Sequence, residues 1–127
     1  MPSPITALKK KRDFKKVYNR GKHAAEPLFV VYALVNDLDD NRLGLSVSKK
    51  VGGAVVRNRV KRLIRECCRL MDLRAGYDFV VIARTPVGAL PRKGSFSTVR
   101  ESLGRLFGRL KLNKSAGDKL NRPTQVN

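Results

Sequence analysis

The sequence of 127 residues has no tryptophan, only two cysteines and a single histidine. Cys67 and Cys68 are adjacent, so they provide no disulfide framework, and we expect a reducing compartment, the cytoplasm. These thiols and His23 also lack the spaced ligand pairs of a structural zinc site. No Ser-His-Asp or Cys-His arrangement can be assembled from the sequence. We therefore expect no catalytic side chains and no metal site in the protein itself.

Long apolar segments are also missing. The longest uninterrupted apolar stretch, Leu28–Val35, is much shorter than the ~20 residues that span a bilayer. Met1–Ala7 contains two prolines and no apolar core of a signal peptide. Gly52-Gly53 is not followed by the Lys-Ser/Thr of a nucleotide-binding P-loop. Membrane insertion, secretion and ATP or GTP binding therefore have no support in the sequence.

Acidic residues are scarce relative to basic ones. Ten Asp and Glu stand against 28 Lys and Arg, which gives a formal net charge of +18. A small chain with this charge repels itself unless a polyanion supplies countercharge. Nucleic acid is the favoured partner, and an anionic membrane surface is a weaker alternative. The length fits one domain, and 42% hydrophobic residues are enough to form a core.

The hydrophobic pattern predicts one α/β domain over residues 1–113, with an extended leader at 1–7 and a disordered basic and polar tail at 114–127. Helices are expected over about Lys10–Asn19 and Ala54–Leu73. A last helix begins at Ser95, whose side chain is expected to cap it, and continues to about Leu110.

Three main strands are predicted, at Leu28–Val35, Leu43–Val47 and Tyr77–Ala83, with a short extra strand near Lys22–Ala25. The first two are joined by an Asn- and Asp-rich turn and are expected to pair as an antiparallel hairpin. The second and third are separated by a helix, which favours a parallel βαβ unit. The expected fold is a two-layer α/β sandwich with a small mixed sheet and about three helices.

Ser46–Arg65 is the most informative segment, because it contains seven cationic residues and no acidic one. At about 100° per residue, the helix separates an apolar arc, with Cys67 and Leu70, from a basic arc, with Cys68 at its edge. Guanidinium groups suit a phosphate backbone. An ordinary solvated face mixes acidic with basic residues, so we favour phosphate binding. The basic arc comprises Arg57, Asn58, Lys61, Arg62, Arg65 and Arg69.

Two features stay open from the residues alone. The Asn58 amide could hydrogen-bond RNA or a neighbouring loop, and its spacing favours neither. Phe14 and Tyr18 lie one helical turn apart among cations, and Tyr32 lies within a strand. These aromatic side chains could stack on unpaired bases, although core packing is the favoured interpretation. His23 is interpreted as a surface or packing residue.

The basic segment closely resembles the signature of the bacterial ribonuclease P protein family. That signature combines a Ser-Lys-Lys strand end, a glycine turn, Ala-Val, Arg-Asn-Arg and Lys-Arg. The matching residues here are Ser48-Lys49-Lys50, Gly52, Ala54-Val55, Arg57-Asn58-Arg59 and Lys61-Arg62. The resemblance covers about residues 8–110. Gly53 departs from it, because that position is often polar or basic in the family.

The resemblance implies a left-handed βαβ crossover and a subunit of an endoribonuclease. The protein would assemble with a large catalytic RNA, which uses Mg²⁺ to remove the 5′ leader of precursor tRNA. The protein would supply binding, and no membrane or stable protein partner is implied. By position, the catalytic RNA would contact Arg57, Asn58, Arg59, Lys61, Arg62 and Arg65. The leader cleft would comprise Phe14, Lys15, Tyr18, Tyr32, Ser48, Lys49 and Lys50.

Two rival functions share part of this evidence. A ribosomal protein would have the same charge and α/β layout, but it would not stimulate 5′ processing. Binding to a membrane surface would depend on the basic segment Lys9–Lys16, which is short and has a small apolar face.

Overall fold

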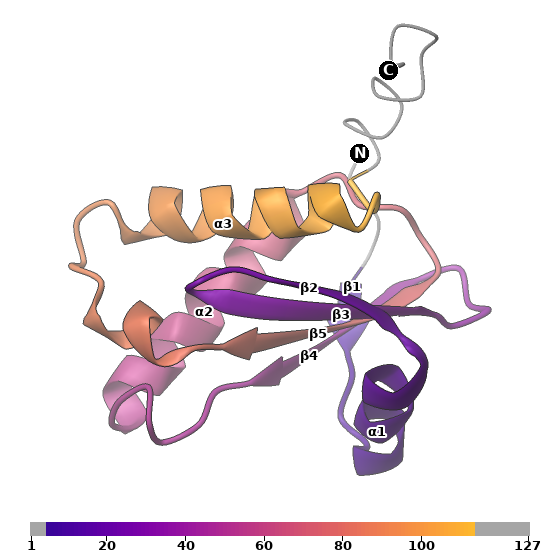
Figure 1. Ribbon diagram of the computed structural model, residues 1–127, viewed down its shortest axis with the longest axis horizontal. Helices are drawn as coiled ribbons and strands as arrows, with labels where there is room; N and C mark the ends of the chain where they lie inside the picture. Colours follow the sequence, from indigo (N-terminus) through magenta and orange to yellow (C-terminus); the bar gives the residue numbers. More distant parts are fainter. Residues whose placement is uncertain (1–4, 114–127) are drawn as a thin grey trace, which may run out of the picture.

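The computed structural model describes residues 5–113, and the tail expected at 114–127 lies outside this range. Five strands and three helices follow one another in a mixed order, with one short 3₁₀ helix (Figure 1). The elements are β1 (Ile5–Ala7), α1 (Lys11–Arg20), β2 (Lys22–Ala25), β3 (Phe29–Val35), β4 (Asn41–Ser46), α2 (Ala54–Leu70), β5 (Tyr77–Ala83), η1 (Thr85–Ala89) and α3 (Ser95–Arg109).

The five strands form one sheet in the order β1-β4-β5-β3-β2. The β1–β4 and β4–β5 pairs are parallel, whereas the β5–β3 and β3–β2 pairs are antiparallel, so the sheet is mixed as expected. β5 is central because it is apolar on both faces: Phe79 and Val81 belong to one buried cluster and Val80 to the other. β4, α2 and β5 form the predicted parallel βαβ unit. Its left-handed sense stays a prediction.

The hairpin expected between Leu28–Val35 and Leu43–Val47 is wrong, because β5 lies between β3 and β4. The connecting loop is pinned to β5 instead: the Asn36 side-chain amide donates to Asp78 Oδ1 at 2.9 Å, and the Asn36 backbone N–H donates to the Gly76 carbonyl. The N-terminal leader was predicted as extended chain, without a strand. Its last residues, Ile5–Ala7, instead pair with β4 as an edge strand.

The two faces of the sheet are covered unequally. α2 and α3 pack on one face and enclose the main core, whereas α1 lies on the opposite face (Figure 1). The small cluster under α1 consists of Leu8, Val17 and Val80, with Phe14 and Tyr32 partly buried against it. The expected α/β sandwich is confirmed, and α1 leaves part of its face of the sheet uncovered.

Three details of the helices differ from expectation. Ser95 does not cap α3, because its hydroxyl donates to the Arg92 carbonyl at 3.0 Å and Gly94 occupies the cap position. Cys68 is buried with Leu73, although the helical pattern placed it at the edge of the basic arc. Leu70, expected in the core, is 59% exposed. Among the described residues, no helix is both long enough and apolar enough to cross a bilayer.

Candidate nucleic-acid interface

A charged network holds α1 over the sheet. Arg42 on β4 donates to both carboxylate oxygens of Asp78 on β5, with Nε–Oδ1 and Nη2–Oδ2 distances of 2.8 and 2.7 Å. The Arg42 Nη1 atom lies 3.7 Å from Asp13 Oδ2 on α1. A paired guanidinium has a fixed planar geometry, so Arg42 sets the position of α1 relative to β4 and β5.

The ring of Phe14 lies directly on the backbone of β4. A Cβ atom added at Gly44 would be 2.5 Å from Phe14 Cζ, closer than any real contact. Glycine at this position therefore lets the ring approach the sheet. Gly44 lies within the range that the resemblance covers, but nothing in the sequence indicated that it faces Phe14.

Four rings from α1, β2 and β3 follow one another along this face, and we call Phe14, Tyr18, Tyr32 and His23 the aromatic row. Their successive ring centroids are 6.4, 5.1 and 5.0 Å apart. Tyr18 meets Tyr32 edge-on, and His23 stacks on Tyr32 with an interplanar angle of 24°. The family resemblance implied that the first three are leader contacts, whereas the residues alone favoured core packing. His23 was missed because its place opposite Tyr32 depends on the pairing of β2 with β3.

Tyr18 is the most accessible tyrosine of the aromatic row, with 37% of its surface exposed. Partial burial raises the pKa of Tyr18 above its ordinary value of 10, and a hydrogen bond with the Ser46 side chain lowers it in part. The phenol is therefore neutral at physiological pH. It lines a groove of about 440 Å³ whose other lining residues are Lys9, Lys11, Phe14, Lys15 and Asn19. Ring faces and three ammonium groups thus meet in one groove.

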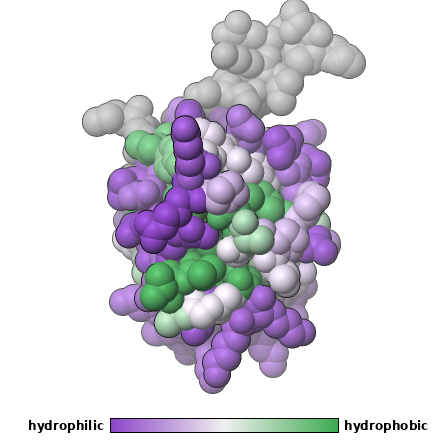
Figure 2. Space-filling model, turned by 90° about the vertical axis from the view of Figure 1, so that its left-hand side faces the viewer, coloured by the Kyte–Doolittle hydropathy of each residue, from purple (hydrophilic) through white to green (hydrophobic). Residues whose placement is uncertain are grey.

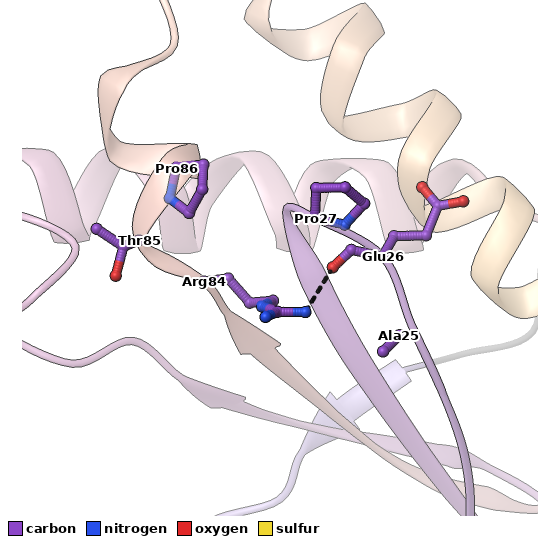
Figure 3. A pocket seen from close by; sticks show the side chains of 6 residues that line it. All are labelled: Ala25, Glu26, Pro27, Arg84, Thr85 and Pro86. Atoms are coloured by element: carbon purple, nitrogen blue, oxygen red, sulfur yellow. Dashed lines mark hydrogen bonds between the residues drawn. The ribbon is translucent and has the colours of Figure 1, made fainter.

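A second hollow lies between the β2–β3 turn and the segment that follows β5. Arg84 directly follows β5, and its Nη1 atom donates to the Glu26 carbonyl at 3.2 Å (Figure 3). The hollow has a volume of about 740 Å³ and is lined by Ala25, Glu26, Pro27, Arg84, Thr85 and Pro86. The Arg84 side chain is exposed and adds a cation at this end of the sheet. Sequence reasoning did not select Arg84 as a site residue.

The other predicted cleft residues occupy the turn between β4 and α2. Ser48, Lys49 and Lys50 are all exposed. The turn is closed by hydrogen bonds from the Val51 N–H to the Ser48 carbonyl and from the Gly52 N–H to the Lys49 carbonyl. It begins two residues after Ser46, the hydrogen-bond partner of Tyr18. The turn therefore connects the strand under the aromatic row to the start of α2.

The cations of α2 do not all share one surface. Asn58, Arg62, Arg65 and Arg69 are exposed, and we call them the α2 crest. Arg57 and Lys61, which the helical pattern grouped with them, are half-buried. Arg57 also has a local role, because its Nε atom donates to the Gly52 carbonyl at 3.2 Å and so braces the start of the helix.

Arg59 is half-buried beside the segment that leads into α3, next to Arg62 of the α2 crest. Its Nη2 atom is 3.4 Å from the Leu90 carbonyl.

Within residues 5–113, the ion pairs are formed by Arg42, Arg105 and Arg109, and no cation of α2 takes part in one. Figure 2 views the end of the molecule where α2 and α3 begin, and hydrophilic residues surround a smaller apolar patch there. The positive charge of α2 is thus free to meet an external anion.

The sequence and the fold are both similar to proteins of one kind. The family model described as Ribonuclease P matches residues 4–111. The ribonuclease P protein component of Caldanaerobacter subterraneus is 46% identical over 109 residues, which cover 84% of this chain and 90% of that protein. The RNase P protein of Staphylococcus aureus superposes with a TM-score of 0.74 at 36% identity, covering 84% of this chain and 96% of the other. That of Thermotoga maritima gives 0.73 at 37% identity, with coverage of 81% and 96%.

Proposed function

The chain belongs to the ribonuclease P protein family, and we propose that it binds two RNAs on separate surfaces. It is a subunit of an endoribonuclease that acts in tRNA 5′ processing together with an RNA subunit. The α2 crest binds that catalytic RNA, and the aromatic row binds the single-stranded 5′ leader of precursor tRNA. The location that suits this substrate is the cytoplasm.

The observation that carries the proposal is the placement of α1 and α2 on opposite faces of the sheet. The aromatic row lies on the α1 face, and the exposed α2 crest belongs to a helix on the opposite face; Figure 1 shows the positions of the two helices. Each surface has its own cations, from Lys9, Lys11 and Lys15 on one side and from Arg62 and Arg65 on the other. Two RNAs can therefore be bound at the same time without competing for the same side chains.

The aromatic row suits a single strand rather than a duplex. Unpaired bases expose their faces, and stacking on an aromatic side chain contributes about 1–3 kcal/mol per base. Tyr18 offers the most accessible phenol, while its edge-on contact with Tyr32 holds the ring in place. The ammonium groups of Lys9 and Lys15 line the same groove, where they can neutralise leader phosphates.

The catalytic Mg²⁺ is assigned to the RNA. Within residues 5–113, no group of three or more His, Cys, Asp or Glu side chains could hold a metal ion. The two buried carboxylates, Glu26 and Asp78, are already bound by arginines. These side chains therefore do not fit a Mg²⁺ site. The contribution of the protein is to neutralise phosphates, so that the two RNAs need less Mg²⁺ to approach each other.

Tyr18→Ala tests the leader surface, with Tyr18→Phe as the matched control that keeps the ring. We expect the alanine variant to bind precursor tRNA roughly 5- to 100-fold more weakly, the equivalent of one lost base stack, and mature tRNA unchanged. Phe14→Ala and Tyr32→Ala are expected to act in the same direction. Equal losses for precursor and mature tRNA would show that these rings only pack the fold.

Arg65→Gln tests the catalytic-RNA surface. The log–log slope of affinity against salt concentration is expected to decrease by ~0.7–0.9 for each lost phosphate contact. Arg20→Gln removes the same charge from α1, on the other face of the sheet, and serves as the control. If both variants left the slope unchanged in a filter-binding titration, α2 would not be the docking surface.

A further inference from the structure

α2 and the segment that begins α3 border a cavity that is open to solvent, with a volume of about 280 Å³. Arg59 and Arg62 line it from α2, and Arg92 lines it from the loop before α3. We call it the arginine cavity. Glu66 also lines it, so the formal charge of the lining is 3 − 1 = +2. The cavity has room for a phosphate group with several waters, each of which occupies about 30 Å³ in the liquid.

One arginine that lines the cavity has an unpaired donor. The Nε atom of Arg59 is buried and has no hydrogen-bond partner within the described part of the chain. The same guanidinium uses Nη2 for the Leu90 carbonyl, at the long distance of 3.4 Å. Because Nε is inaccessible to solvent, the Nη groups are the part of this guanidinium that an anion in the cavity would meet, and one of them makes only the long contact with Leu90.

The start of α3 adds further donors to the cavity wall. Gly94, the cap residue, has a left-handed backbone with φ of 83° and no side chain that could accept from the first-turn amides. The nearby hydroxyls do not replace it, because Ser95 Oγ donates to the Arg92 carbonyl and Thr98 Oγ1 donates to the Gly94 carbonyl. The Ser95 N–H donates to the Arg92 carbonyl, so the amides that follow it in the first turn of this 15-residue helix are the ones that can donate to an anion.

We propose that the arginine cavity binds one backbone phosphate of the catalytic RNA and so extends the docking surface from α2 onto α3. Arg62 belongs both to the α2 crest and to the cavity, so a strand that crosses the crest reaches the cavity directly. The proposal rests on the proposed docking of α2 on RNA. It assigns Arg92, which lies outside the family signature, a direct contact with that RNA.

Arg92→Gln tests the proposal against Lys93→Gln, which removes the same charge from the next, exposed residue outside the cavity. In a salt titration with the catalytic RNA, Arg92→Gln is expected to lower the slope by ~0.7–0.9 and to weaken binding several-fold. Lys93→Gln is expected to leave the slope unchanged. Equal effects of the two variants, or no effect of Arg92→Gln, would overturn the proposal.

Arg65→Gln, measured in the same series, separates this proposal from the docking of α2. A loss of slope for Arg65→Gln without one for Arg92→Gln would refute the cavity site and leave the α2 crest as the docking surface. An unchanged slope in both variants would refute both.

Inorganic phosphate provides a test without RNA. The Arg59 Nε–H resonance is expected to shift saturably when phosphate is titrated into the full chain and followed by NMR. Glu66→Gln removes the one carboxylate of the lining and is expected to tighten phosphate binding several-fold, whereas Arg92→Gln weakens it. A shift that does not saturate, or that is the same in all three proteins, would show only unspecific ionic-strength effects and would contradict the site.

Discussion

Gly44 has no side chain, and this allows the Phe14 ring, the first of the aromatic row, to lie against β4. Phe14 occupies the space over Gly44 that any other residue would fill. Because the obstructing atom belongs to the end of a side chain, a larger residue at position 44 would displace the ring rather than the strand. The sequence could indicate Phe14 as a candidate leader contact. Why position 44 needs a glycine becomes clear only from the packing of α1 on β4.

Gly44→Ala is therefore predicted to impair leader binding by moving Phe14. We expect a several-fold loss of affinity for precursor tRNA relative to mature tRNA, and a decrease of about 1–3 kcal/mol in the free energy of unfolding from overpacking. Gly104→Ala is the control, because a Cβ there meets no atom within 4 Å. In the interior of α3 it should raise stability by about 1 kcal/mol. Unchanged tRNA discrimination in Gly44→Ala would contradict a role of Phe14 in the leader site.

Glu26 joins the β2–β3 turn to α3. Its carboxylate is buried and accepts hydrogen bonds from Arg105, Arg109 and Ser102, with distances of 2.8–3.1 Å. The hydrogen bonds from Arg105 are the largest cause that lowers the pKa of Glu26 below its ordinary value of 4.5, while burial acts in the opposite direction. The ionised carboxylate is thus favoured in the folded protein.

The lowered pKa predicts how stability depends on pH. Above about pH 4.5 the contribution of Glu26 is fully present, and it is lost as the pH falls through the depressed pKa of the folded state. Glu26→Gln should lower stability at pH 7 and flatten this acid-side decrease, as measured by urea unfolding across pH. Glu101→Gln, an exposed position on the same helix, should leave the profile unchanged. An identical decrease in wild type and Glu26→Gln would contradict the assignment.

At the scale of elements, α2 shows what a helical pattern can predict. The apolar arc correctly places Val60, Ile64 and Cys67 in the core. It fails at the C-terminal end of the helix, where Cys68 is buried and Leu70 is exposed. The chain after the helix folds back there, with the Arg74 N–H bound to the Leu112 carbonyl. A pattern confined to the helix contains no information about this covering segment.

The two thiols of α2 are predicted to be unreactive in the folded protein. Burial raises the pKa of Cys67 to about 11 and also raises that of Cys68. At pH 8, labelling by a thiol reagent should therefore proceed at the rate of unfolding and accelerate in urea. Labelling of the native chain at the rate of a free peptide thiol would show that one cysteine is exposed.

The order of the strands in the sheet could not be predicted from the sequence. The strand segments themselves were predicted well, with Tyr77–Ala83 observed as β5. Their pairing was not, because the order depends on which apolar strand takes the centre, and no local pattern determines this. His23 and Arg84 were missed for the same reason. His23 lies opposite Tyr32 only because of the register between β2 and β3. Arg84 reaches the Glu26 carbonyl only because the end of β5 lies beside the β2–β3 turn.

At the scale of the whole molecule, the net charge of +18 includes two separate groups of cations, one on α2 and one beside the aromatic row. Composition predicts a polyanionic partner, and the family signature locates the α2 cations. The fold adds that the lysines beside the aromatic row lie on the opposite face of the sheet from α2. This separation suits a protein that brings two RNAs together and leaves the chemistry to one of them.

Reconstitution with the catalytic RNA at low Mg²⁺, with release of the 5′ leader as the readout, tests this account most directly. The account predicts slow cleavage by the RNA alone and faster cleavage when the protein is added. It also predicts that the stimulation is reduced in both Arg65→Gln and Tyr18→Ala. High Mg²⁺ should restore cleavage by the RNA without the protein. Cleavage by the protein in the absence of RNA, or no stimulation at low Mg²⁺, would contradict the account.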